Sequence, residues 1–231
     1  MTFSIITEFV ILFVMTSPFW HMLLISRAAG HTLLQTTFLQ TIMLFWTAYG
    51  FFVVTYAFDA PYFGVLAPAL PVLYITLAAS VAYLARNWIL GNGVSQHILI
   101  GLQLFRPVGG VFVLEDYRGT LPTVFAQPAG WGDVMAGIIA AFVLAKFWNT
   151  KIPRNWVIFV AVFGLADFAS ALFFGVTSSD TPFQLFSHDA PNRVREYPLG
   201  LIPLFLVPYA VVAHILSLTQ LANDRKNSPS K

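Results

Sequence analysis

The sequence predicts an all-α membrane protein, a bundle of seven transmembrane helices with its N-terminus outside and its C-terminus in the cytoplasm. Of the 231 residues, 58% are hydrophobic and only 10% are charged, whereas soluble domains carry roughly 25% charged residues. The mean hydropathy is +0.75. Seven stretches are apolar over the length that crosses a bilayer, about 20 residues. The basic residues also fall mostly on one side of the resulting topology.

The predicted spans are separated by short segments rich in Pro, Gly, Asp and Asn, which favour turns. The spans cover residues 3–25, 33–57, 65–85, 98–116, 132–148, 155–176 and 199–218. No basic stretch precedes the first span, so we expect a retained helix and not a cleaved signal peptide. Residues 1–221 are expected to form one transmembrane domain, and the polar tail 222–231 is expected to be disordered.

Lys and Arg determine the predicted orientation. With the N-terminus outside, eight basic residues fall on the inner side: Arg27, Arg86, Lys146, Lys151, Arg154, Arg225, Lys226 and Lys231. Three fall on the outer side: Arg118, Arg193 and Arg195. Acidic residues, among them Asp59, gather at or near the outer face.

Arg106 lies inside the fourth predicted span, about 8 residues from its start and roughly 12 Å deep. An arginine at mid-helix costs about 2.5–3.5 kcal/mol on insertion scales, so a buried anion should accompany it. Asp167, near the middle of the sixth span, lies at a similar predicted depth. We therefore predict an Arg106–Asp167 pair facing the interior of the bundle. Whether this pair is a structural clip between helices or a functional site stays open.

Pro107, Gly109 and Gly110 follow Arg106 and predict a kinked or broken helix. Transporters build binding sites from discontinuous helices near the midplane of the membrane. The alternative is a kink that only lets neighbouring helices pack closely.

Residues 120–131 are too apolar for a free loop and too interrupted by Pro to span, so we predict a segment that dips into the outer leaflet. Asp133 would then be the N-cap of the fifth span. Alternatively, Asp133 joins Glu115 and Asp116 in an outward-facing acidic cluster that attracts cations. The spacing of these acids matches no metal-binding motif, and we predict no metal site.

Glu8 in the first span and His214 in the seventh are candidate proton-carrying groups. Glu8 could instead be ionised at the membrane interface. Haem would need two facing histidines, and among those predicted in the inner half only His214 lies well inside a helix. We expect no cofactor.

Four motifs carry a resemblance: RPVGG (106–110), GTLP (119–122), PAGWGD (128–133) and EYPLGLIPLFLVPYAVVAHILSL (196–218). With them, roughly the second half of the chain resembles a group of small, uncharacterised bacterial multi-spanning membrane proteins. The resemblance implies a bacterial inner membrane. It implies no activity and assigns no functional residue.

We expect a small carrier or channel-like protein for protons, cations or a small solute, surrounded by lipid and without a nucleic-acid partner. The alternatives are a non-catalytic membrane subunit, an intramembrane enzyme for a lipid or quinone, and a haem-binding protein. An enzyme would use Asp133, Glu115 and His214, but the acids and the histidine are predicted at opposite depths. The chain has no P-loop, G-x-S-x-G or H-E-x-x-H motif, and we assign no catalytic residue.

Overall fold

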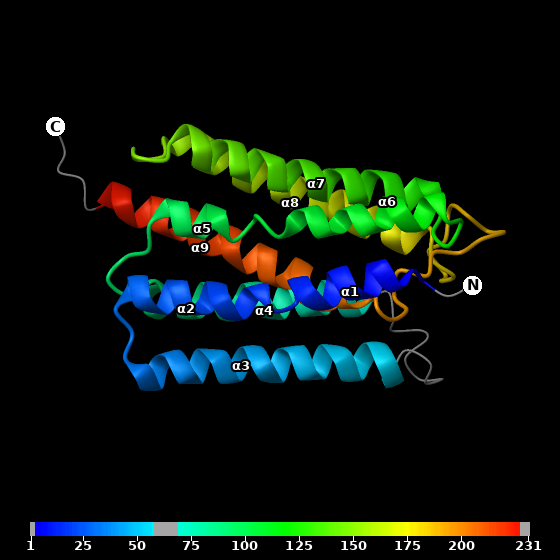
Figure 1. Ribbon diagram of the computed structural model, residues 1–231, viewed down its shortest axis with the longest axis horizontal. Coiled ribbons are helices and arrows are strands. Elements are labelled where there is room, and N and C mark those ends of the chain that lie inside the picture. The colour runs from blue at the N-terminus through cyan, green and yellow to red at the C-terminus, as the bar shows by residue number, and fades with distance from the viewer. Residues whose placement is uncertain (1–2, 58–68, 227–231) are drawn as a thin grey trace.

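The computed structural model describes residues 3–57 and 69–226, and within these ranges it contains helices and no strands (Figure 1). Seven helical stretches in this part of the chain are long and apolar enough to cross a membrane. The predicted all-α class and the number of candidate spans are therefore confirmed. Asp59 and residues 65–68, the predicted start of the third span, lie outside the described residues.

The helical elements run back and forth along one elongated bundle (Figure 1). In chain order they are α1 (Ile5–Val14), α2 (Ser17–Ala29), α3 (Leu33–Phe52), a π-helical turn (Val53–Ala57), α4 (Ala69–Leu90), α5 (Gln96–Gly101), a 3₁₀ turn (Arg106–Gly109), α6 (Gly110–Tyr117), α7 (Thr123–Lys146), α8 (Arg154–Thr177), a second π-helical turn (Ile202–Leu206) and α9 (Val207–Lys226). We call the end of the bundle where α1 begins the N-end, and the end where α9 finishes the C-end.

Capping residues explain where several helices begin and end. Gly30 ends α2 in the left-handed conformation, with φ of 76°, which glycine adopts without steric strain. Thr32 and Gln35 form a capping box at the start of α3, and the Ser95 side chain caps α5. These polar residues supply partners for backbone N–H groups that have none within the helix.

The fourth span is discontinuous. Regular α-helix ends at Gly101, and the chain resumes as the 3₁₀ turn from Arg106 to Gly109 before α6 begins at Gly110. Pro107 cannot donate a backbone hydrogen bond, and its ring would clash with the carbonyl four residues earlier. The helix from α5 therefore cannot continue unchanged through Arg106.

The fifth span is longer than predicted, and this overturns two sequence-based expectations. α7 begins at Thr123 and contains Pro128 within it, so residues 123–131 are helical and do not form a dipping segment. Asp133 is accordingly a mid-helix residue, and its proposed role as N-cap is wrong. Proline near the start of a membrane helix removes few hydrogen bonds, and neighbouring helices compensate for them.

α9 lies at the centre of the bundle, where it packs against α4, α8 and α5. Its span is more deeply buried than the others in the described chain. α9 also extends to Lys226, so residues 222–226, predicted as part of a disordered tail, are helical. Residues 227–231 lie outside the described residues.

Candidate functional site

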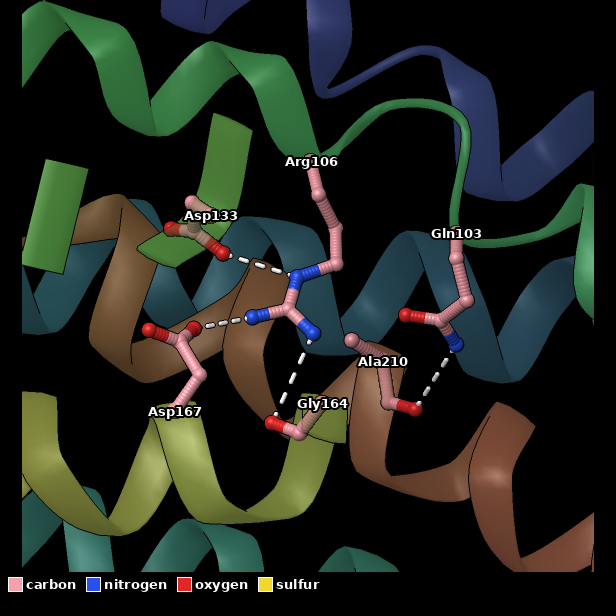
Figure 2. A network of polar contacts seen from close by, with 6 residues as sticks. All are labelled: Gln103, Arg106, Asp133, Gly164, Asp167 and Ala210. Carbon is pink, nitrogen blue, oxygen red and sulfur yellow. Dashed lines mark hydrogen bonds and ion pairs between the residues drawn. The ribbon is translucent and has the colours of Figure 1, made fainter. Parts of the chain in front are cut away.

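Arg106 is buried at the junction of three helices, with a side chain only 1% exposed. Its Nε donates a hydrogen bond to Oδ1 of Asp133 on α7 at 2.8 Å, and its Nη2 donates to Oδ2 of Asp167 on α8 (Figure 2). Its Nη1 points to the carbonyl oxygen of Gly164 at 3.5 Å. The guanidinium carbon lies 3.9 Å from the centre of the Phe168 ring. The structure thus brings Arg106 and Asp167 together and adds Asp133, which we had not placed there.

Two glycines make room for the two carboxylates. A side-chain carbon on Gly109 would lie 2.7 Å from the carboxyl carbon of Asp133, and one on Gly132 would lie 2.6 Å from that of Asp167. Heavy atoms that are not bonded do not approach so closely. Gly109 and Gly132 therefore let the 3₁₀ turn, α7 and α8 approach closely enough for both carboxylates to reach one guanidinium.

His214 of α9 lies beside the same guanidinium. A side-chain carbon built on Gly164 would lie 2.7 Å from Arg106 Nη1 and 2.8 Å from His214 Cε1, so both groups border the space that Gly164 leaves open. His214 is 2% exposed, and its Nε2 has no hydrogen-bond partner among the described residues. The predicted separation in depth between His214 and Asp133 is therefore wrong.

The cluster contains two acidic groups and one guanidinium. Arg106 supplies one permanent cation, while Asp133 and Asp167, whose side chains are 10% and 8% exposed, can supply two anions. Removing each ion from water costs several kcal/mol, and an unpaired buried charge costs more than a paired one. The arrangement therefore favours uptake of one further positive charge, either a proton or a cation.

An apolar cavity of about 80 Å³ reaches this cluster from the N-end side of the bundle. Asp133 and Phe168 line it, and so do Arg195 and Thr181 of the loop after α8. A smaller space of about 10 Å³ shares Asp133 and Phe168 and extends to Arg106. The volume of the larger cavity is several times the roughly 10–15 Å³ that one water molecule needs. It therefore has room for a small ligand.

On the other side of the cluster, polar groups lead towards the C-end. Gln103 donates from Nε2 to the Ala210 carbonyl at 3.3 Å (Figure 2), and its Oε1 has no partner among the described residues. Further along, buried Ser217 donates to Gln96 Oε1 at 2.7 Å. Buried polar groups are normally hydrogen-bonded. Gln103 Oε1 and His214 Nε2 are therefore suited to form hydrogen bonds with water molecules.

This polar series ends at an open pocket of about 580 Å³ at the C-end, which Gln96 and His97 help to line. Gln220, Asp224 and Lys151 border the same pocket. Asp224 accepts a hydrogen bond from Gln220 Nε2 at 2.8 Å and lies 3.4 Å from Lys151 Nζ. His214, Ser217, Gln220 and Asp224 follow one another on α9 at about one-turn spacing, as residues on one helix face do.

The predicted acidic cluster of Glu115, Asp116 and Asp133 is not present. Glu115 is 0% exposed and accepts hydrogen bonds from the Ser4 backbone N–H at 2.9 Å and from the hydroxyl groups of Thr7 and Thr120. Glu115 thus ties the start of the first span to α6.

Asp116 points elsewhere and accepts from Thr123 Oγ1 at 2.7 Å and Gln127 Nε2 at 2.6 Å at the start of α7. Asp133 lies at the guanidinium, since its helix begins nine residues earlier than predicted. No group of three or more potential metal-ligating side chains occurs among the residues the structure describes.

Glu8 and His214 lie apart and do not form one site. Glu8 accepts a hydrogen bond from the Tyr197 hydroxyl at 2.7 Å. Burial, together with the hydrogen bond to Glu8 and its negative charge, raises the pKa of Tyr197 from 10.0 to about 12. Glu8 therefore contacts a loop at the N-end, whereas His214 borders the Arg106 cluster.

The other three histidines that were considered for haem have separate partners. His21 Nδ1 lies 3.0 Å from the Tyr209 hydroxyl, His31 Nε2 2.8 Å from the Trp88 carbonyl oxygen, and His97 Nε2 2.8 Å from the Phe147 carbonyl oxygen. His21, His31, His97 and His214 therefore each have different neighbours. This arrangement does not support axial ligation of one haem by two of them.

The seven candidate spans are those of a multi-pass membrane protein, here one with a charged cluster inside its bundle. Residues 64–222 match the family described as Domain of unknown function (DUF8737), and because this is more than half of the chain, the protein belongs to that family. No curated protein and no solved structure matched the chain. The family description agrees with the resemblance to an uncharacterised group, and it assigns no activity.

Proposed function

We propose that this protein is a small membrane carrier that moves protons or small cations through the cluster of Arg106, Asp133 and Asp167. The observation that supports it is the presence of two carboxylates on one guanidinium within the apolar spans. Intramembrane ionisable residues mark ion and proton pathways, and this cluster can accept one more positive charge than it holds.

Features on both sides of the cluster support the same proposal. The apolar cavity reaches Asp133 from the N-end, and the polar series from His214 to the open pocket leads to the C-end. A carrier needs a central site that exchanges its cargo with each side in turn. In the proposed carrier Arg106 belongs to that central site, and the 3₁₀ turn that interrupts the fourth span at Arg106 supports this role.

A purely structural clip is the competing interpretation, and the second carboxylate argues against it. One aspartate would neutralise Arg106, and a second buried acid adds desolvation cost without adding a cation. A site for a transient positive charge explains that second acid directly.

We further propose that the protein lies in a bacterial inner membrane with its N-end outside. Basic residues at helix ends support this orientation, because the described C-end carries Arg27, Lys146 and Arg154 among others while the N-end carries fewer. Cytoplasmic segments attract an excess of Lys and Arg.

Flux measurements in proteoliposomes test the function. Purified protein is reconstituted with a pH-sensitive dye inside, and a potassium gradient with valinomycin sets an inside-negative potential. We expect proton uptake above that of empty liposomes, and Asp133→Asn or Asp167→Asn should reduce it at least about tenfold. Asp180→Asn, an exposed carboxylate outside the spans, is the matched control and should retain it.

Sodium flux is measured under the same potential with a sodium-selective dye, and potassium flux is measured without valinomycin, because valinomycin itself carries potassium. If the wild-type protein moves no protons, sodium or potassium in these measurements, the proposal fails. Unchanged flux in both aspartate variants would show that transport does not use this cluster.

A further inference from the structure

The apolar cavity combines hydrocarbon walls with a charged floor. Its walls include Phe112, Phe125, Phe168 and Val207, while Asp133 supplies an acidic group at the end that adjoins the cluster. Phe112 and Phe125 pack edge to face with ring centres 5.2 Å apart. Such a cavity excludes a strongly hydrated ion and fits a molecule that is mostly apolar and carries one polar group.

The floor of the cavity accepts hydrogen bonds and does not donate them. Asp133 uses Oδ1 for Arg106 Nε at 2.8 Å, and a carboxylate has further lone pairs for other donors. The guanidinium is 1% exposed and directs its nitrogens at Asp133, Asp167 and Gly164. At this floor an anionic ligand would meet a carboxylate and no accessible guanidinium donor, whereas a cation would complete the charge balance.

The aromatic walls fit the apolar part of the ligand. Three phenylalanine rings border this cavity, and they give a hydrocarbon body apolar surface to pack against. At the outer part of the cavity, Arg195 adds a positive side chain, which disfavours a second positive group on the ligand. The charges along the cavity therefore select a molecule with one cationic group at its inner end.

We propose that the apolar cavity binds a small monovalent lipophilic amine, with its ammonium group at Asp133 and its hydrocarbon body between Phe112, Phe125 and Phe168. This inference rests on the proposed function, since it names the cargo of the same carboxylate cluster. It goes further in specifying that the cation is organic and that its apolar part is recognised.

Isothermal titration calorimetry with three ligands of one shape tests the inference. Benzylamine is positively charged at neutral pH, benzyl alcohol is neutral and benzoate is negative. The wild-type protein should bind benzylamine at least about tenfold more tightly than benzyl alcohol, and it should not bind benzoate. Asp133→Asn should remove the preference for the amine, while Asp180→Asn should keep it.

A cavity-filling variant separates the hydrocarbon pocket from the charge. Ala171 lines the cavity from α8, and Ala171→Phe should abolish binding of benzylamine and benzyl alcohol alike without altering the charges. Equal affinities for the three ligands, tighter binding of benzoate, or no benzylamine binding at millimolar concentration in the wild type would each overturn the inference, whatever the folding of the variants.

The outcomes of this test and of the flux test are distinguishable. Proton flux without benzylamine binding would remove the organic-cation site and leave the proposed carrier. Benzylamine binding that requires Asp133, without flux of any cation, would keep the site and remove the carrier.

Discussion

Gly132→Ala tests the packing that holds the charged cluster together. A methyl group at Gly132 would overlap Oδ1 of Asp167 and lie 2.6 Å from its carboxyl carbon. To avoid this overlap the Asp167 side chain has to move, and it then loses the hydrogen bond that Arg106 Nη2 donates to it. Losing one partner of a buried ion pair costs about 3–5 kcal/mol, while replacing glycine by alanine within a helix gains about 1 kcal/mol.

We therefore expect Gly132→Ala to destabilise the protein by about 2–4 kcal/mol. For a chain of this size that corresponds to a fall in Tm of roughly 5–15 °C, measured by thermal unfolding of the purified protein in detergent. Gly50→Ala is the matched control, because Gly50 also lies within a helix and a methyl group there would meet no atom within 4 Å. It should leave the Tm unchanged or raise it slightly.

A double-mutant cycle identifies the partner of the clash. In an Asp167→Ala background the overlapping carboxylate is absent, so Gly132→Ala should no longer destabilise and should gain the helix preference of alanine. The reasoning is refuted if Gly132→Ala lowers the Tm equally in both backgrounds, or if it behaves like Gly50→Ala in the wild type.

Three further predictions concern the guanidinium of the cluster and two polar contacts elsewhere. Arg106→Lys keeps the charge but lacks the planar fork that reaches two carboxylates, so proton flux in proteoliposomes should fall at least about tenfold. Glu115→Gln removes the negative charge from the side chain that accepts a hydrogen bond from the Ser4 N–H. It should lower the free energy of unfolding by about 1–3 kcal/mol and speed hydrogen exchange in α1. Unchanged exchange would contradict this prediction. Because the pKa of Tyr197 is raised to about 12, neutral tyrosine stabilises the fold below pH 10, and this contribution should disappear between about pH 10 and 12. Tyr197→Phe should show a smaller loss of Tm over that interval, and an identical loss would count against the contact with Glu8.

The number of spans could be predicted because lipid imposes a simple requirement. A spanning segment must satisfy its own backbone hydrogen bonds and present apolar side chains, so helices of about 20 apolar residues are readable from composition alone. The contact between Arg106 and Asp167 followed from the same requirement, because a deep guanidinium needs an anion at a similar depth. Neither step needed knowledge of which helices are neighbours.

Asp133 could not be placed by this reasoning because the prolines within residues 120–131 were interpreted as interrupting any spanning helix. In water, proline and glycine do favour loops. Within a membrane bundle the backbone has no water to replace its helical hydrogen bonds, so a helix can persist through a proline, as α7 does through Pro128. There, small residues serve close helix packing, and Gly132 makes room for Asp167. One sequence feature could have indicated the position of Asp133. This residue directly follows Gly132, and Gly130 and Gly132 are two residues apart in an apolar stretch, a pattern typical of close helix packing.

One helix boundary changed the interpretation of the whole site. The predicted start of the fifth span at Gly132 and the observed start of α7 at Thr123 differ by nine residues, or about 14 Å at about 1.5 Å per residue. That is nearly half of the roughly 30 Å hydrocarbon thickness, enough to move Asp133 from the surface to the level of Arg106. At the surface, a third acid would only strengthen a cation-attracting mouth. Beside Arg106 it makes the buried cluster one positive charge short, and the proposals for proton transport and amine binding both depend on that deficit.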